Sequence, residues 1–316
     1  MSAIRPLLTG LGAYTRAGRF GRRYLRDLLR QSNRNGSGSA SDYMRDQRQW
    51  KLLMRNFSRC DGCFSAWVPR GITSATGSDR LRIYRRLVPF AWVSQAIRVR
   101  MFAAFGLECD RAAEERSILQ SFTHREWNDL ADQWGISHAD LYDIFNPDKP
   151  LRSEMKLYQS FSRRLIRSVP AESFPNYYRL VQASPWAVSP HTSREAARKV
   201  TSENALFSVR ISFYIMRDQL PDAFLQVLPA FGFWLYCLDE FADLERDARV
   251  GKNTYMSTVT DPEKELENVF RQMAAALEEA APRPRVLLDY LELLQRDVVR
   301  LKRRGVDIEK RLLHAD

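Results

Sequence analysis

The sequence predicts an all-α fold for the part of the chain that follows residue 41, and three observations support this prediction. Apolar residues recur every three or four positions, which is the spacing that gives a helix one apolar face. Glycine and proline residues separate these segments, as at Gly135, Pro170 and Pro221. The sequence contains no convincing run of alternating β-branched residues joined by hairpin turns.

The first group of predicted helices lies between residue 42 and Pro170. Gly135 ends one of these helices, and Pro147 and Pro150 separate the next two. A proline disfavours the helical conformation in the residue before it, so Pro170 ends the group. The predicted helices span residues 42–58, 78–106, 110–134, 137–145 and 151–168.

The second group of predicted helices follows Pro170 and contains the most apolar stretch of the chain. Pro185 and Pro190 separate its first two helices, Pro221 lies at the start of the third, and Gly251 follows that helix. Pro282 lies between the last two. The helices of this group span residues 171–182, 192–217, 220–249, 261–281 and 283–303.

The composition is typical of a folded protein with a large apolar core. The chain has 316 residues, of which 45% are hydrophobic and 11% aromatic, and these values exclude global disorder. The formal net charge is +11, but arginines in residues 1–35 supply much of the excess. The remainder is mildly basic and has no zinc-finger, RNA-binding or helix-turn-helix signature, so we expect no nucleic-acid partner.

Residues 1–41 form a basic amphipathic segment that ends in a flexible linker rich in glycine and serine. Three interpretations stay open for residues 1–31: an amphipathic helix attracted to an anionic membrane, a targeting peptide rich in arginine, or a basic disordered tail. We expect residues 42–316 to form one all-α domain. A homodimer is compatible with the sequence.

The four cysteines indicate a reducing compartment. Cys60, Cys63, Cys109 and Cys237 are too few and too scattered for a disulfide-stapled secreted domain. Cys60 and Cys63 have the spacing of half a zinc site, but no second pair follows, which favours structural or incidental thiols. No stretch reaches the ~18 apolar residues of a membrane span. We therefore expect a cytoplasmic protein, with peripheral membrane attachment and organellar targeting left open.

An acidic stripe is the most informative feature of the sequence. Asp239, Asp243 and Asp247 follow one another at four-residue intervals, directly after an apolar run at 231–238. Each such step rotates a helix position by only about 40°, so the three carboxylates share one face. Anions that emerge from a buried helix need neutralisation, and carboxylate oxygens suit Mg²⁺. The sequence therefore predicts a magnesium site here.

A second polar cluster lies about 110 residues earlier in the chain. Asn128, Asp129 and Asp132 place side-chain oxygens on adjacent turns of one predicted helix. If the stripe binds Mg²⁺ for a diphosphate that is released as a leaving group, several cations must surround that group. We therefore expect this second cluster to face the stripe. The alternative interpretation is an ordinary charged helix surface in both places, with the stripe paired to Arg246, Arg249 and Lys252.

These motifs resemble those of class I isoprenoid synthases, a family that includes terpene synthases and trans-prenyltransferases. The segment 128–132 resembles their first aspartate-rich motif and the segment 239–247 their second, while 251–255 is similar to a tail found in phytoene and squalene synthases. The resemblance covers about residues 80–260. It implies an antiparallel helical bundle of the class I terpenoid synthase type with a central apolar cavity.

The sequence also departs from the family pattern. Asn128 stands where the family usually has Asp, which replaces a charged metal ligand by a neutral one. The region that chain-elongating prenyltransferases use to hold a second diphosphate is not evident, and neither is the Arg-Tyr pair of many terpene cyclases. A cationic residue must hold the released diphosphate, and Arg194 and Lys252 are the candidates.

The resemblance implies a Mg²⁺-dependent terpene synthase, a carbon–oxygen lyase that ionises and cyclises a linear prenyl diphosphate with release of diphosphate. Several Mg²⁺ ions would bind with the substrate. One alternative is a head-to-head prenyl condensing enzyme of the squalene and phytoene type. The other is a non-catalytic helical partner that retains the fold.

Overall fold

A computed structural model of the chain describes residues 90–91, 93–134, 162, 164–169, 193–249, 251 and 253–305. These residues fall into two compact units. The first unit includes residues 90–99, 110–134 and 162–169, and the second includes residues 100–109 and 193–305. The expected basic segment, 1–41, lies outside the described residues, so its boundary stays a prediction.

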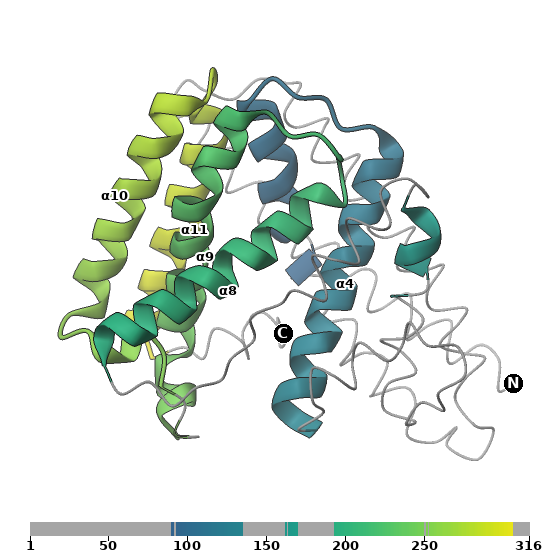
Figure 1. Cartoon of the computed structure of the whole chain (residues 1–316). Coiled ribbons are helices and arrows are strands. Elements are labelled where there is room, and N and C mark those ends of the chain that lie inside the picture. The colour runs from purple at the N-terminus through teal and green to yellow at the C-terminus, as the bar shows by residue number, and fades with distance from the viewer. Residues whose placement is uncertain are drawn as a thin grey trace, which may run out of the picture. The chain divides into compact units, whose positions relative to one another are not determined.

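The all-α prediction is confirmed, because every regular element among the described residues is a helix. An unlabelled helix covers 93–104. The elements in Figure 1 are α4 (Arg111–Trp134), α8 (Arg194–Tyr214), α9 (Asp222–Arg249), the 3-10 turn η4 (Met256–Thr258), α10 (Pro262–Ala280) and α11 (Arg285–Arg303).

The ends of the labelled α-helices agree closely with the sequence prediction, because local capping signals set several of them. Ser193 accepts a hydrogen bond from the backbone N–H of Ala196 and so caps the start of α8. Asp261 does the same for Lys264 at the start of α10, where Pro262 takes the first helical position. The helices predicted at 42–58, 137–145 and 171–182 lie outside the described residues.

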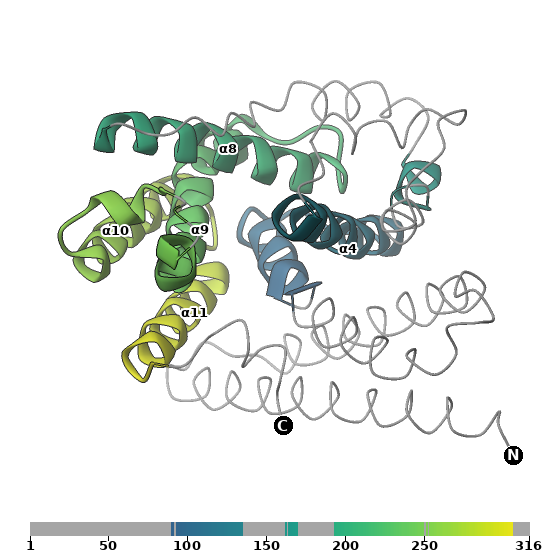
Figure 2. The same ribbon diagram turned by 90° about the horizontal axis from the view of Figure 1, so that it is seen from below.

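The second unit is a helical bundle built around α9. Figure 2 shows α9 with α8, α10 and α11 on three sides. Thr201 and Ser208 of α8 bond to Glu240 and Tyr236 of α9 respectively, so the two helices run in opposite directions. The N-terminal two thirds of α9 are largely buried and apolar, which places the unit's core along this helix. The predicted central cavity stays a prediction.

α8 and α9 approach each other closely at Gly232. A Cβ atom at this position would lie 3.0 Å from the carbonyl oxygen of Ala205 and 3.1 Å from Cγ2 of Val209. Only a residue without a side chain allows the two backbones this approach. On the opposite side of α9, the indole N–H of Trp234 donates to Gln295 of α11 at 2.8 Å.

No helix in the described part of the chain combines the length and apolar character needed to cross a membrane.

Candidate functional site

The acidic stripe lies on the C-terminal turns of α9, and its carboxylates become less exposed along the helix. α9 continues without a break to Arg249, so the three positions share one face, as predicted. Asp239 is exposed, the Asp243 side chain is 21% exposed, and Asp247 is buried. The stripe therefore leads from solvent towards the interior of the unit.

Arg246 supplies positive charge to this stripe. Its Nη2 atom lies 2.5 Å from Oδ2 of Asp243, and its Nε lies 3.8 Å from Oδ1 of Asp247. Such pairing is the alternative to metal binding that the spacing of these residues predicts, and the structure contains it. The Arg246 side chain is 39% exposed, so solvent screens both pairs and leaves each of them weak.

The acids of the stripe suit a Mg²⁺ ion that keeps water or phosphate ligands better than they suit a metal ion held entirely by protein side chains. Among the residues that the structure describes, no three His, Cys, Asp or Glu side chains are arranged to hold one metal ion. Mg²⁺ is usually held by one or two carboxylates and keeps water or phosphate oxygens as its other ligands. Asp239 and Asp243 are the acids of the stripe that reach solvent, and they provide the hard oxygen ligands that this mode needs.

The first motif lies on the last turns of α4, where the backbone is helical as predicted. The side chains of Asn128, Asp129 and Asp132 lie outside the description, so their expected role as metal ligands stays a prediction. The expected position of the first motif opposite the stripe stays a prediction too, because the two motifs belong to separate units.

A buried arginine joins α4 to the neighbouring helix in the first unit. Arg98 Nη1 donates to the carbonyl of Ser117 at 2.6 Å and to the hydroxyls of Ser117 and Ser121 at 2.9 and 2.8 Å. One turn further along α4, His124 stacks on Phe90 with the ring centroids 6.2 Å apart. Burial, assisted by the charges of Arg98 and Arg125, lowers the pKa of His124 to about 4. His124 is therefore neutral at pH 7.

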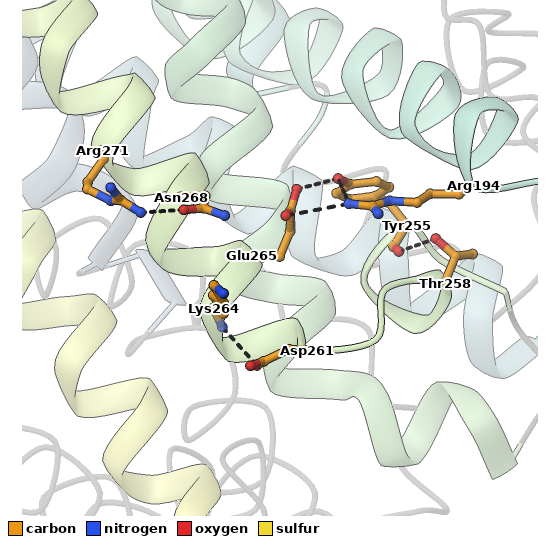
Figure 3. A network of polar contacts seen from close by, with 8 residues as sticks. All are labelled: Arg194, Tyr255, Thr258, Asp261, Lys264, Glu265, Asn268 and Arg271. Atoms are coloured by element: carbon orange, nitrogen blue, oxygen red, sulfur yellow. Dashed lines mark hydrogen bonds and ion pairs between the residues drawn. The ribbon is translucent and has the colours of Figure 1, made fainter.

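Arg194, a candidate for holding diphosphate, is the first residue of α8. Figure 3 shows its guanidinium beside Tyr255 and Glu265. Nη2 donates to the Tyr255 hydroxyl at 3.3 Å and lies 3.5 Å from Oε2 of Glu265. The side chain is 56% exposed, so it can still reach an external anion. Lys252, the other candidate, lies outside the described residues.

Glu240, a residue that the sequence analysis did not single out, lies next to the stripe. Its Oε1 atom accepts from the Thr201 hydroxyl at 2.8 Å, and its Oε2 accepts from the backbone N–H of Met256 at 3.0 Å. One signal in the sequence points to it, since Glu240 is an acid that lies off the stripe beside a buried apolar run. Its two donors come from distant segments and could not be inferred from spacing.

The aromatic residues of the second unit pack mainly with one another. The ring of Phe213 lies 5.0 Å from that of Phe224 and 6.1 Å from that of Phe231, measured between centroids. Phe231 in turn lies 6.2 Å from Trp234. These contacts make the four rings part of the core of the bundle.

Comparison with known proteins finds similarity in structure alone. No family model matches the sequence, and no curated protein matches it significantly. A geranyltransferase from Legionella pneumophila is similar over 80% of this chain and 98% of its own, with 12% identity and a TM-score of 0.46. An FPP/GFPP synthase from Zymomonas mobilis is similar over 79% and 99%, with 14% identity and a TM-score of 0.45. Similarity at this level carries no argument about chemistry, for which the residues themselves are the basis.

Proposed function

We propose that the chain is a Mg²⁺-dependent class I terpene synthase that ionises and cyclises a linear prenyl diphosphate and releases diphosphate. The observation that supports this most is the acidic stripe of Asp239, Asp243 and Asp247 on one face of α9, directly after a buried apolar segment. Buried carboxylates are kept where they are paired or coordinate a metal, and carboxylate oxygens are ligands that Mg²⁺ accepts. The resemblance of the two motifs to those of isoprenoid synthases supplies the reaction class.

Each group has a role that follows from its chemistry. Asp239 and Asp243, with the acids of the 128–132 motif, would hold Mg²⁺, which neutralises the diphosphate and stabilises it as a leaving group. Arg194 would bind a diphosphate oxygen through its exposed guanidinium. Exclusion of water from the apolar part of the bundle would protect the allyl cation from premature capture.

Diphosphate release is the experiment that tests this proposal. The wild-type chain is incubated with geranyl, farnesyl, geranylgeranyl and longer prenyl diphosphates, with and without Mg²⁺, beside Asp243→Ala. We expect metal-dependent release with at least one substrate and a loss of about 100-fold or more in the variant. Asp222→Ala removes an exposed acid from the first turn of the same helix and should release diphosphate as the wild type does.

The reaction products distinguish a terpene synthase from the remaining enzymatic alternative, a head-to-head condensing enzyme. The segment 251–255 resembles the tail of squalene and phytoene synthases, which join two prenyl chains head to head. A terpene synthase yields a hydrocarbon or alcohol with the carbon count of one substrate, and a condensing enzyme yields twice that count. Folded wild-type protein that releases no diphosphate from any of the substrates would instead support the non-catalytic helical partner.

A further inference from the structure

The segment that follows the stripe, residues 253–258, is held to the bundle at two neighbouring residues. We call this segment the tail loop. Its two attachment points are the backbone N–H of Met256 and the side chain of Tyr255, both fully buried. Their partners come from α9, α10 and α8. The tail loop is therefore fixed to α9, which carries the stripe, and to α8 and α10.

The first attachment uses both oxygens of the Glu240 carboxylate. One accepts from Thr201 and the other from Met256, at 2.8 and 3.0 Å. An ionised carboxylate is an acceptor only, so it matches two donors without leaving either unpaired. Thr201 is 6% exposed and Met256 is fully buried, which shields the two hydrogen bonds from water.

The second attachment places the Tyr255 hydroxyl on α10. This hydroxyl donates to Oε1 of Glu265 at 2.5 Å and accepts from Arg194 (Figure 3). Burial and the hydrogen bond to Glu265 raise the pKa of Tyr255, so the hydroxyl keeps its proton at neutral pH. The exposed Arg194 adds little to the attachment, because solvent screens its charge.

We infer that Glu240 is a positioning residue that fixes the rotation of α9 about its own axis, and through it the direction of the metal-binding stripe. This inference rests on the proposed function. Successive helix positions differ by about 100°, so the two hydrogen bonds that hold Glu240 also set the direction in which its neighbour Asp239 points. Both oxygens of Glu240 accept from protein donors, which suits a positioning role for this acid.

Two substitutions at the same position test the inference. Glu240→Gln can keep both contacts, because the Thr201 hydroxyl can turn to accept from the amide while the amide oxygen accepts from Met256. Glu240→Ala loses both. The measurement is the affinity for Mg²⁺ with inorganic pyrophosphate, taken by calorimetry on the full chain. We expect Gln to stay within about 3-fold of the wild type and Ala to lose about 10-fold or more.

Two more variants complete the experiment. Thr201→Val removes one donor without changing the shape of the side chain, and it replaces Glu240→Ala in the test if that variant does not fold. We expect Thr201→Val to weaken the affinity for Mg²⁺ with pyrophosphate by about 3-fold or more. Glu245→Ala removes a 76% exposed acid of the same helix end and should match the wild type. Hydrogen exchange at the Met256 amide reports the attachment directly, and it should accelerate in Glu240→Ala but not in Glu240→Gln.

The outcomes distinguish the two proposals. Equal losses for Gln and Ala would identify Glu240 as a metal ligand and overturn the inference. Wild-type affinity in the Ala variant or in folded Thr201→Val would overturn it as well, while leaving the proposed function intact. Failure of the wild type to bind Mg²⁺ with pyrophosphate would overturn the proposed function, and with it the role of Glu240 at a metal site.

Discussion

α4 and α9 each end in a predicted metal-binding motif, yet the buried residues that precede the two motifs differ in kind. In α9 these residues are apolar, apart from Gly232 at the contact with α8. The buried positions of α4 include a large polar set: Glu114, Ser117, Gln120, Ser121, Thr123 and Glu126. Apolar contacts tolerate small shifts, whereas buried polar groups demand matched partners. The difference predicts that the two helices fail in different ways when altered.

The largest effect is expected at Arg98, which donates three hydrogen bonds to α4. Arg98→Leu removes three donated hydrogen bonds and leaves buried groups of Ser117 and Ser121 without that donor. We expect a loss of about 3 kcal/mol in the free energy of unfolding, measured by urea denaturation. Arg111→Leu, at a side chain 65% exposed on the same helix, should change it by less than about 0.5 kcal/mol. Equal losses of stability for Arg98→Leu and Arg111→Leu would show that the buried hydrogen bonds of Arg98 contribute no more to α4 than an exposed side chain does.

The next effect is steric and tests the packing of α9. Gly232→Ala introduces a Cβ atom 3.0 Å from a backbone oxygen of α8, which cannot move without shifting the helix. We expect a loss of about 2 kcal/mol, against the gain of about 1 kcal/mol that alanine normally brings to a helix interior. Gly251→Ala is the matched control, because its φ of +70° is strained for alanine but no atom lies within 4 Å. It should cost about 1 kcal/mol.

The smallest effect is the pH dependence of stability that we expect from His124 of α4. His124 has a pKa of about 4 in the folded chain and a usual value near 6.5 in the unfolded one. Between these values the unfolded chain binds the additional proton, so stability falls as the pH is lowered from 6.5 towards 4. His124→Phe keeps a ring to stack on Phe90 and cannot be protonated.

Unfolding free energies of the wild type and of His124→Phe at pH 7.5 and 5.5 measure this dependence. The wild type should lose about 1 kcal/mol more than the variant over this interval. Identical pH profiles would show that His124 accepts a proton in the folded chain as easily as in the unfolded one.

The helices were predictable because their signals are local. Ser193 and Asp261 cap their helices through contacts three residues away, and Gly251 follows the end of α9. The types of the neighbouring residues were therefore sufficient to predict these helix ends. The positions of Asp239 and Asp243 on one face also follow from their spacing alone.

The partners of the site residues were not predictable in the same way. Arg194 lies 61 positions from Tyr255 in the sequence, and Glu240 lies 39 from Thr201. Such pairs depend on which helices become neighbours and on their rotation, and periodicity within one helix does not contain that information. The pairing of Arg246 with Asp243 is a local contact between residues three positions apart, so their spacing predicts it as the alternative to metal binding.

The contact between Gly232 and Ala205 also has a mechanical consequence for the stripe. No side chain separates the backbones here, and the acids of the stripe lie beyond this contact along α9, so a tilt of the helix about the contact would displace each acid in proportion to its distance from Gly232. At a rise of 1.5 Å per residue, Asp239 is about 10 Å from the contact and Asp247 about 22 Å. A tilt of about 5° would move the first by about 1 Å and the second by about 2 Å. Of the two acids proposed to bind Mg²⁺, Asp243 would therefore lose register with the ion before Asp239, which lies nearer the contact.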